Sequence, residues 1–268
     1  TMTPEAVKSS GIVIETAGPA KIKTTIKVNG RVQPNEDHMT HVIPRYPGIV
    51  KKIHKRLGDT VTKDEVVAVV ESNESLQSYD VKSSIGGTVI GKDVRQGEFV
   101  KEGEVIYSVA DLSTVWVDLN VNRKDFDRLK IGQAVKIFAG EGVTNATGTV
   151  SYISPFGAED TQTMLARVEL PNPTGKWRPG LFVTGEIVVE EADVPVAVKP
   201  GALQTFRDWD VVFMQDGGMF EIAILELGRR DAKWAEVLSG LNPGQKYAAE
   251  NSFIIKADIL KSGASHDH

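Results

Sequence analysis

Histidine is the residue type in this sequence best suited to bind a metal ion, because the chain contains no cysteine. The sequence ends in His266-Asp267-His268, and two neutral imidazoles in a flexible segment can close on one Zn, Co, Cd, Ni or Cu ion. Two imidazoles alone leave a zinc-type coordination sphere incomplete, so a polar tail or the remnant of a tag stays open as the alternative. We take His266 and His268 as the first candidate ligands of a transient metal ion, and we expect no resident cofactor.

A second candidate pair lies near the N-terminus. The sequence predicts a short strand from His38 to Ile43, in which Met39 and His41 share one face and His38 faces the other way. A thioether beside an imidazole suits Cu(I), although ordinary exposed residues at a barrel edge are the favoured interpretation of the pattern. His54 follows Lys52 and precedes Lys55 and Arg56, and these positive charges repel a cation. We therefore interpret His54 as a surface residue.

Catalytic motifs are missing from the sequence. It has no Gly-x-Ser-x-Gly elbow, no phosphate-binding loop, no dinucleotide fingerprint and no His-Glu-x-x-His zinc motif. Five acidic residues recur near glycines, and their predicted role is to form turns and carry solvated charge. They are Asp59, Asp64, Glu65, Glu98 and Glu104. We predict that the chain is not an enzyme.

The amino-acid composition limits the number of domains and the class of protein. The 268 residues suffice for two or three modest domains, and 41% apolar with 25% charged residues is ordinary for a globular protein. A net charge of −5 argues against a nucleic-acid partner. No apolar run approaches the roughly twenty residues that span a bilayer. Because Thr1-Met2-Thr3-Pro4 does not begin a signal peptide, we expect a mature or trimmed chain without its export signal or anchor.

Residues 48–70 and 87–109 repeat one another at a constant offset of 39. Matching positions include Gly48 with Gly87, Val50 with Val89, Gly58 with Gly97, Asp59 with Glu98, Val61 with Val100, and Glu65 with Glu104. Each half predicts short strands rich in valine, separated by a glycine that can adopt the positive φ of a tight turn. Neither half can bury its apolar face alone, so the two together predict a small, flattened β-sandwich.

This doubled unit resembles the lipoyl/biotinyl fold, the barrel-sandwich hybrid. In carriers of that fold, the resemblance implies an acceptor lysine in a tight turn between the halves. Here a predicted loop, 71–84, joins the halves, and its one lysine, Lys82, lacks the Met-Lys-Met or Asp-Lys-Ala flanks. We interpret Lys82 as a solvated surface residue. A carrier domain of a biotin- or lipoate-dependent acyltransferase remains the alternative.

The rest of the chain also reads as short strands. Residues 11–32 alternate in polarity, with Gly18-Pro19 and Asn29-Gly30 as predicted breaks. Strands expected at 115–121, 133–138, 147–153, 163–170 and 182–190, with a short helix at 123–130 capped by Asn122, predict a small β-barrel. The acidic residues 190–193 are expected to interrupt the strands, and further strands are expected after them up to residue 238. With a single short helix, the predicted class is mainly β.

Several motifs in order resemble one family. They are the two half-repeats, Asp111-Leu112-Ser113-Thr114-Val115-Trp116-Val117, Arg178-Pro179-Gly180-Leu181-Phe182-Val183, and Leu241-x-Pro243-Gly244. Together they look like the periplasmic adaptor subunits, or membrane fusion proteins, of RND-type efflux pumps. The stretch 71–77 and the His-Asp-His ending look most like the cobalt–zinc–cadmium branch of that family.

The resemblance implies a modular layout. A lipoyl-like domain would occupy 45–111, a β-barrel would combine 30–44 with 112–191, and a discontinuous membrane-proximal β domain would combine 1–29 with 192–262, ahead of a polar tail at 263–268. Most members insert a long α-helical hairpin between the lipoyl halves, and here residues 71–84 leave no room for one. We interpret the short connection as natural, because it shows no Gly/Ser linker.

The resemblance also implies a function. The chain would be a non-enzymatic adaptor, periplasmic and associated with the inner membrane, that bridges an RND transporter exporting heavy-metal cations toward an outer-membrane channel. Copies would self-associate into a ring and form a duct. Three alternatives remain open: an adaptor for an ABC-type or drug exporter, the carrier domain described above, and a free periplasmic metal chaperone.

Overall fold

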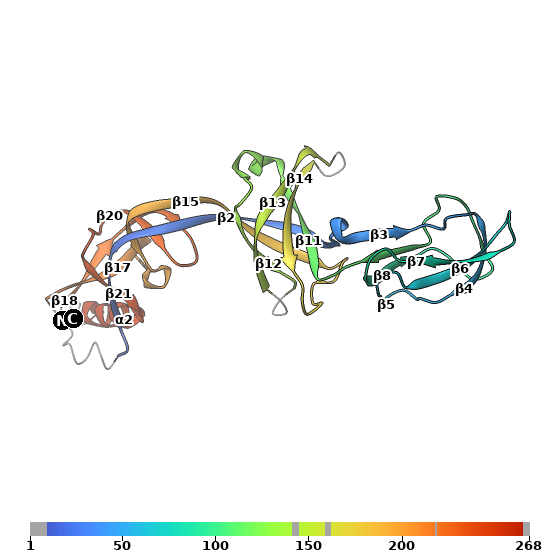
Figure 1. Ribbon diagram of the computed structural model, residues 1–268. Coiled ribbons are helices and arrows are strands. Elements are labelled where there is room, and N and C mark those ends of the chain that lie inside the picture. The colour runs from blue at the N-terminus through green and yellow to red at the C-terminus, as the bar shows by residue number, and fades with distance from the viewer. Residues whose placement is uncertain (1–9, 141–144, 159–161, 218, 265–268) are drawn as a thin grey trace. The chain divides into compact units, whose positions relative to one another are not determined.

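The computed structural model describes residues 10–140, 145–158, 162–217 and 219–264 (Figure 1). Contacts divide the chain into two compact units, Thr1–Thr25 with Val188–His268 and Ile26–Ile187. The chain passes between them twice, in the 17-residue strands β2 (Gly18–Pro34) and β15 (Phe182–Val198). The predicted mainly-β class is confirmed. The finer domain boundaries at 29/30, 44/45 and 111/112 stay predictions.

The repeat forms two four-stranded sheets within the larger unit. One sheet has the strand order β3-β10-β8-β5, and the other has β7-β6-β4-β9. The strands are β3 (Met39–Val42), β4 (Gly48–Ile53), β5 (Thr60–Val61), β6 (Val66–Ser72), β7 (Ser78–Lys82), β8 (Gly87–Lys92), β9 (Phe99–Val100) and β10 (Tyr107–Ala110). Each half contributes a short strand to the sheet formed by the other half, since β4 pairs with β9 and β8 pairs with β5. A shared core of valines, with Ile106 and Tyr107, lies between the sheets.

The prediction of a loop at 71–84 is wrong. Residues 78–82 form β7, which pairs antiparallel with β6 so that Tyr79 faces Val70. Strand β3 makes the equivalent pairing with β10, where Thr40 faces Val109, again at an offset of 39. The repeat therefore extends to β3 and β7, but of its side chains only Val42 and Val81 match, which hid the second strand from the sequence pattern. No α-helix lies between β6 and β7, as predicted.

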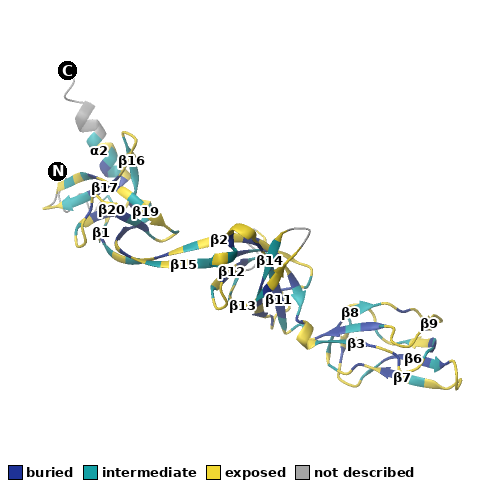
Figure 2. Ribbon diagram, turned by 90° about the horizontal axis from the view of Figure 1, so that it is seen from above, coloured by how far each residue is buried: buried dark blue, intermediate teal, exposed yellow. Residues whose placement is uncertain are grey.

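A closed β-barrel completes the larger unit. Its strands follow the order β12-β13-β14-β11-β2-β15, and β12 pairs back onto β15. They are β11 (Thr114–Asn122), β12 (Ala134–Phe138), β13 (Asn145–Gly157) and β14 (Thr163–Pro171), with parts of β2 and β15. Fully buried Val32, Leu119 and Ile137 point into the barrel, and Figure 2 shows buried residues alternating with exposed ones along its strands.

The smaller unit is built around a five-stranded sheet of order β1-β21-β17-β16, with β18 also paired to β17. Its elements are β1 (Val13–Thr16), η3 (Pro200–Ala202), β16 (Gln204–Phe206), β17 (Trp209–Asp216), β18 (Met219–Ile224), β19 (Glu226–Arg230), β20 (Ala235–Ser239), β21 (Lys246–Glu250) and the helix α2 (Phe253–Ala264). Helix α2 packs Ile255 against Ile12, Phe213 and Ala248. No described helix has the length and apolarity needed to cross a bilayer.

Two predicted strand breaks are not found. Strand β15 runs straight through the acidic residues 190–193, where Lys23 Nζ lies 3.0 Å and Lys21 Nζ 3.7 Å from the Glu191 carboxylate. Strand β2 likewise continues through Asn29-Gly30. At Gly30 a Cβ atom would lie 2.2 Å from the carbonyl oxygen of Asp118, so glycine permits a close approach of β2 to β11 instead of a turn.

The helical predictions need correction as well. The predicted helix at 123–130 is a 3₁₀ helix, η2 (Arg123–Arg128), and the Asn122 side chain makes no capping hydrogen bond. Helix α2 was not predicted, because its polar residues do not follow a clear helical period and its sequence begins with two β-branched residues after Phe253. Another 3₁₀ helix, η1 (Glu36–His38), occupies the start of the expected strand at 38–43.

Candidate functional site

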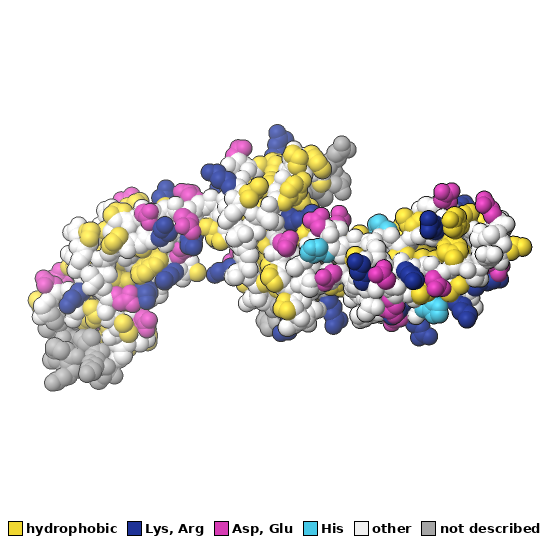
Figure 3. Space-filling model, viewed as in Figure 1, with side chains coloured by type: hydrophobic (Ala, Val, Ile, Leu, Met, Phe, Trp, Pro, Cys, Tyr) yellow, Lys and Arg dark blue, Asp and Glu magenta, His cyan; other side chains and the backbone are white. Residues whose placement is uncertain are grey.

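The candidate metal ligands lie apart from one another. His41 is exposed on β3, with Nδ1 3.1 Å from Ser108 Oγ, and Met39 is half-buried on the same strand. His38 belongs to η1 instead of β3, and its Nδ1 lies 3.1 Å from Thr114 Oγ1. His54 is exposed, and Figure 3 shows the histidines of the visible face as isolated groups. His266 and His268 lie outside the described residues.

Within the described part of the chain, no three His, Asp or Glu side chains come close enough to hold a metal ion together. The His41 and Met39 pair therefore stays a prediction with two possible ligands, and the imidazole already has a hydroxyl partner through Nδ1. If this pair takes a metal ion, the free Nε2 of His41 is the nitrogen that would bind it.

Lys82 does not occupy the position that a carrier lysine would need. It is the exposed last residue of β7, whereas the turn between β6 and β7 comprises residues 73–77. That turn is tight: Ser72 Oγ accepts hydrogen bonds from the backbone N–H groups of Glu74 and Ser75. At its tip Leu76 is 73% exposed with φ of 55°. The turn presents a leucine and an acid to solvent, with no amine to acylate.

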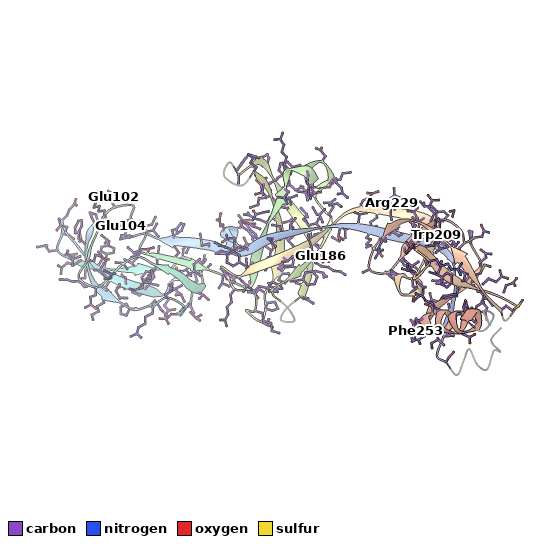
Figure 4. All side chains as sticks on the ribbon, turned by 180° about the vertical axis from the view of Figure 1, so that it is seen from behind. Glu102, Glu104, Glu186, Trp209, Arg229 and Phe253 are labelled. Atoms are coloured by element: carbon purple, nitrogen blue, oxygen red, sulfur yellow. The ribbon has the colours of Figure 1, made fainter. Side chains whose placement is uncertain are left out.

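The acidic residues of the repeat form turns, as predicted. Asp59 accepts a hydrogen bond from the backbone N–H of Arg56, and Glu98 accepts the equivalent bond from Arg95. The same turn chemistry recurs further along each half. Glu65 accepts from the backbone N–H of Thr62 at 2.8 Å, and Glu104, labelled in Figure 4, accepts from Lys101 at 2.7 Å. These carboxylates are acceptors for main-chain donors, which is the turn-forming role predicted for them.

One of the two equivalent turns also contains a lysine that forms an ion pair. Lys55 Nζ lies 2.6 Å from Glu65 Oε1, and the Lys55 carbonyl accepts a hydrogen bond from the hydroxyl of buried Tyr107. The position equivalent to Lys55 in the other half is Val94, so Glu104 has no such partner there. The Lys55 ammonium, followed by the Thr62 backbone donor, lowers the pKa of Glu65 from 4.5 to about 2.

This asymmetry predicts a pH effect on stability. Because the folded pKa of Glu65 is depressed, its ionised form stabilises the fold fully above pH 4.5, and that contribution is lost as the pH falls from 4.5 toward 2. Glu65→Gln should lower the urea unfolding midpoint at pH 7 and leave it less dependent on pH than in the wild type. Glu104→Gln is the matched control, since both amides can still accept the turn hydrogen bond. Equal pH profiles for the two variants would refute the assignment.

Arg167 organises the outside of the barrel at β11 and β14. Its Nε and Nη2 donate to the two carboxylate oxygens of Asp118 at 2.7 and 3.0 Å, and its guanidinium lies 3.7 Å from the centroid of Trp116. The paired carboxylate raises the pKa of Arg167. A shallow groove of about 390 Å³ adjoins it, walled by Tyr152, Phe156 and Leu165. Phe156 is 73% exposed at this groove, so its wall presents an apolar ring to solvent.

The sequence pattern missed this group. Asp118 and Arg167 are 49 positions apart, and only the antiparallel register of β11 with β14 makes them cross-strand neighbours. With both strands predicted, an acid on one strand and an arginine on the other could have suggested a cross-strand ion pair. The register between the strands, which decides whether the two residues are opposite, could not be determined from one sequence.

Three family models match successive parts of the chain between residues 38 and 256. Residues 38–111 match the family described as CzcB-like, barrel-sandwich hybrid domain, and residues 114–191 match the CusB-like, beta-barrel domain. Residues 196–256 match the CzcB C-terminal circularly permuted SH3-like domain.

Two relatives are 30% identical to this chain over an alignment of 337 residues, which includes gaps because this chain has 268. They are the cation efflux system protein CzcB of Alcaligenes sp. (strain CT14) and the cobalt-zinc-cadmium resistance protein CzcB of Cupriavidus metallidurans. Both alignments cover 100% of this chain and 65% of the relative, so the chain spans about two thirds of their length. The crystal structure of ZneB from Cupriavidus metallidurans superposes with a TM-score of 0.57 at 17% identity, covering 90% of this chain and 92% of that one, which supports the same fold.

Proposed function

The chain belongs to the CzcB-like membrane fusion proteins, and from this premise we propose that it is the periplasmic adaptor subunit of an RND-type heavy-metal efflux system. One observation carries the proposal. A barrel-sandwich hybrid without a carrier lysine in its turn, a closed β-barrel and an SH3-like domain follow one another in a single chain. These domains are β scaffolds, which suit a part that spaces and clamps other subunits.

The role we propose is architectural and non-enzymatic. The chain would act in the periplasm at the inner membrane, where it would hold an RND transporter and lead toward an outer-membrane channel, with further copies of itself forming a ring. Strand edges and exposed turns, such as the Leu76 tip, are the features that could dock such partners. The exported ions would be divalent or monovalent heavy-metal cations, and the name of one CzcB relative refers to cobalt, zinc and cadmium.

Direct metal binding would be an addition to this role. His41 with Met39, or His266 with His268, are the residues we propose for a transient heavy-metal ion. Calorimetric titration with Zn²⁺, Co²⁺ and Cu⁺ tests this metal binding. The wild-type chain is compared with His41→Ala and with a variant that lacks both C-terminal histidines. Equal heats for all three proteins would remove these histidines from the proposal, and no heat in any of them would remove metal binding.

A resistance assay tests the adaptor role itself. Deleting the gene in its native cells should lower the concentrations of zinc, cobalt or cadmium that permit growth, and restoring it in full should recover them. The strain lacking the cognate transporter is the control, because losing both genes should be no worse than losing the transporter. Unchanged tolerance to every metal tested would contradict the proposed function.

A further inference from the structure

The turn between β19 and β20, residues 231–234, is tied to strand β2 by one side chain. Asp231 Oδ1 accepts hydrogen bonds from the backbone N–H groups of Lys233 and Trp234, both at 2.7 Å, and these two bonds shape the turn. Asp231 Oδ2 accepts a third hydrogen bond, at 2.9 Å, from the backbone N–H of Lys23, which is 208 positions away in the sequence. The turn does not need this third bond, so Asp231 both forms a turn and holds a distant strand.

The bond from Lys23 lies on an edge of β2 that no described strand covers at that point. Val32 exchanges backbone hydrogen bonds with residues 180 and 181, next to the start of β15. Backbone N–H groups alternate between the two edges of a strand, so Lys23, an odd number of positions earlier, directs its N–H to the opposite edge. Strand β11 covers that edge only from Asn29 to Pro34. The Asp231 carboxylate therefore takes the place of the carbonyl of a neighbouring strand.

The same hairpin also contacts β15, the other strand that passes between the two units. Trp234 is half-buried and packs against Ile22 of β2 and Val194 of β15. Arg229, labelled in Figure 4, has its Nη2 3.7 Å from Glu190 Oε1 on β15. All of these residues belong to the smaller unit. The β19–β20 hairpin therefore holds both strands shortly before they leave that unit.

This attachment is small enough to open without unfolding the unit. In the described register, β20 pairs with β15 at two positions only, the last of which joins Val198 to Ala235. The hydrogen bond between Asp231 and Lys23 is exposed to solvent. Segments with few buried contacts and exposed hydrogen bonds open locally at a lower free energy than the fold as a whole.

We propose that the turn 231–234 is a latch on the two crossing strands. When the latch is closed, Asp231 holds β2 at Lys23, and the connection that can bend between the units begins only after that residue. When it is open, the earlier part of β2 is released and the connection becomes longer. The chain passes between the units only at 25/26 and 187/188, so the latch sets how freely the units move. The proposal does not depend on the adaptor function.

Hydrogen exchange measured on the full chain tests whether Asp231 holds β2. In Asp231→Asn an amide oxygen still accepts the two turn hydrogen bonds, but the amide nitrogen cannot accept from Lys23. We expect the peptide 19–26 to exchange roughly tenfold faster or more, because a hydrogen bond to a charged group is lost. Peptides from β17, β21 and the barrel should keep their wild-type rates.

Asp193→Asn is the matched control for this measurement. Its carboxylate lies on β15, 3.9 Å from Lys21 Nζ, with 85% of the side chain exposed, and its loss should leave the peptide 19–26 unchanged. Wild-type exchange of this peptide in Asp231→Asn would show that the carboxylate does not hold β2. Faster exchange throughout the smaller unit would show that Asp231 only stabilises the fold. Either result overturns the proposal.

Single-molecule energy transfer tests whether the latch limits the motion of the units. The cysteine-free chain can be labelled at Asp216→Cys on β17 and Lys136→Cys on β12, exposed positions in different units. We expect Asp231→Asn to broaden the distribution of distances between the dyes, and Asp193→Asn to leave it as in the otherwise unchanged chain. Equal widths in Asp231→Asn and the unchanged chain would mean that opening the turn does not free the units, and the latch would be refuted.

Discussion

Replacing Asn172 with alanine is expected to destabilise the larger unit by about 3 kcal/mol. Asn172 is 4% exposed, and its amide makes three hydrogen bonds. Nδ2 donates to the carbonyls of Leu112 and Trp177, and Oδ1 accepts from the Trp177 backbone N–H. Alanine would leave these buried groups without partners, at a cost of about 1–3 kcal/mol for each one that water cannot reach.

Urea unfolding followed by tryptophan fluorescence measures this effect. The midpoint for Asn172→Ala should fall by about 1 M or more, with little change in slope. Trp116 and Trp177 report on the larger unit, and Trp209 and Trp234 on the smaller one. Asn145→Ala, at an exposed position on β13, is the matched control and should change the midpoint little. A midpoint for Asn172→Ala equal to that of the control would refute the hydrogen-bond assignment.

Gly48→Ala is expected to disrupt the barrel-sandwich hybrid, at a cost on the order of 3 kcal/mol or more. A Cβ atom at this buried position would lie 1.9 Å from the carbonyl oxygen of Glu71, and both partners are backbone within paired strands. No side-chain rotation can relieve that clash, so β4 and β6 would have to separate. The equivalent Gly87 meets the carbonyl of Ala110 in the same way, at 2.4 Å.

Hydrogen exchange followed by mass spectrometry locates this effect. Peptides from β4, β6 and β9 should lose protection in Gly48→Ala. Gly86→Ala is the control, because its Cβ would lie 3.5 Å from the nearest atom, an ordinary contact. Equal protection in the two variants would show that β4 and β6 are not packed as described.

The repeat made much of the fold predictable. A glycine followed by an acid at Gly58-Asp59 and again at Gly97-Glu98 defines two turns without any alignment, and both glycines have positive φ, of 90° and 85°. Apolar alternation located most barrel strands for the same reason: one buried face imposes a period of two.

Other features could not be predicted because they depend on partners far away in sequence. Strand β7 has Asp80 and Lys82 on its exposed side, and only pairing with β6 makes it a strand. Strand β15 continues through 190–193 because Lys21 and Lys23 neutralise Glu191. Helix α2 is stabilised by packing of Ile255 on the sheet, which no local pattern encodes.

Only part of the candidate site could be predicted from the sequence. The turn-forming role of Glu65 and Glu104 followed from their spacing, whereas the ion pair with Lys55 depends on one half differing from the other.

Crosslinking in native membranes, followed by mass spectrometry of the attached proteins, tests the central claim most directly. The adaptor account predicts peptides of this chain joined to an RND-type transporter and to further copies of itself, with Lys82 unmodified. A chain carrying biotin or lipoate on Lys82, or one joined to an ABC exporter and to no RND transporter, would contradict it.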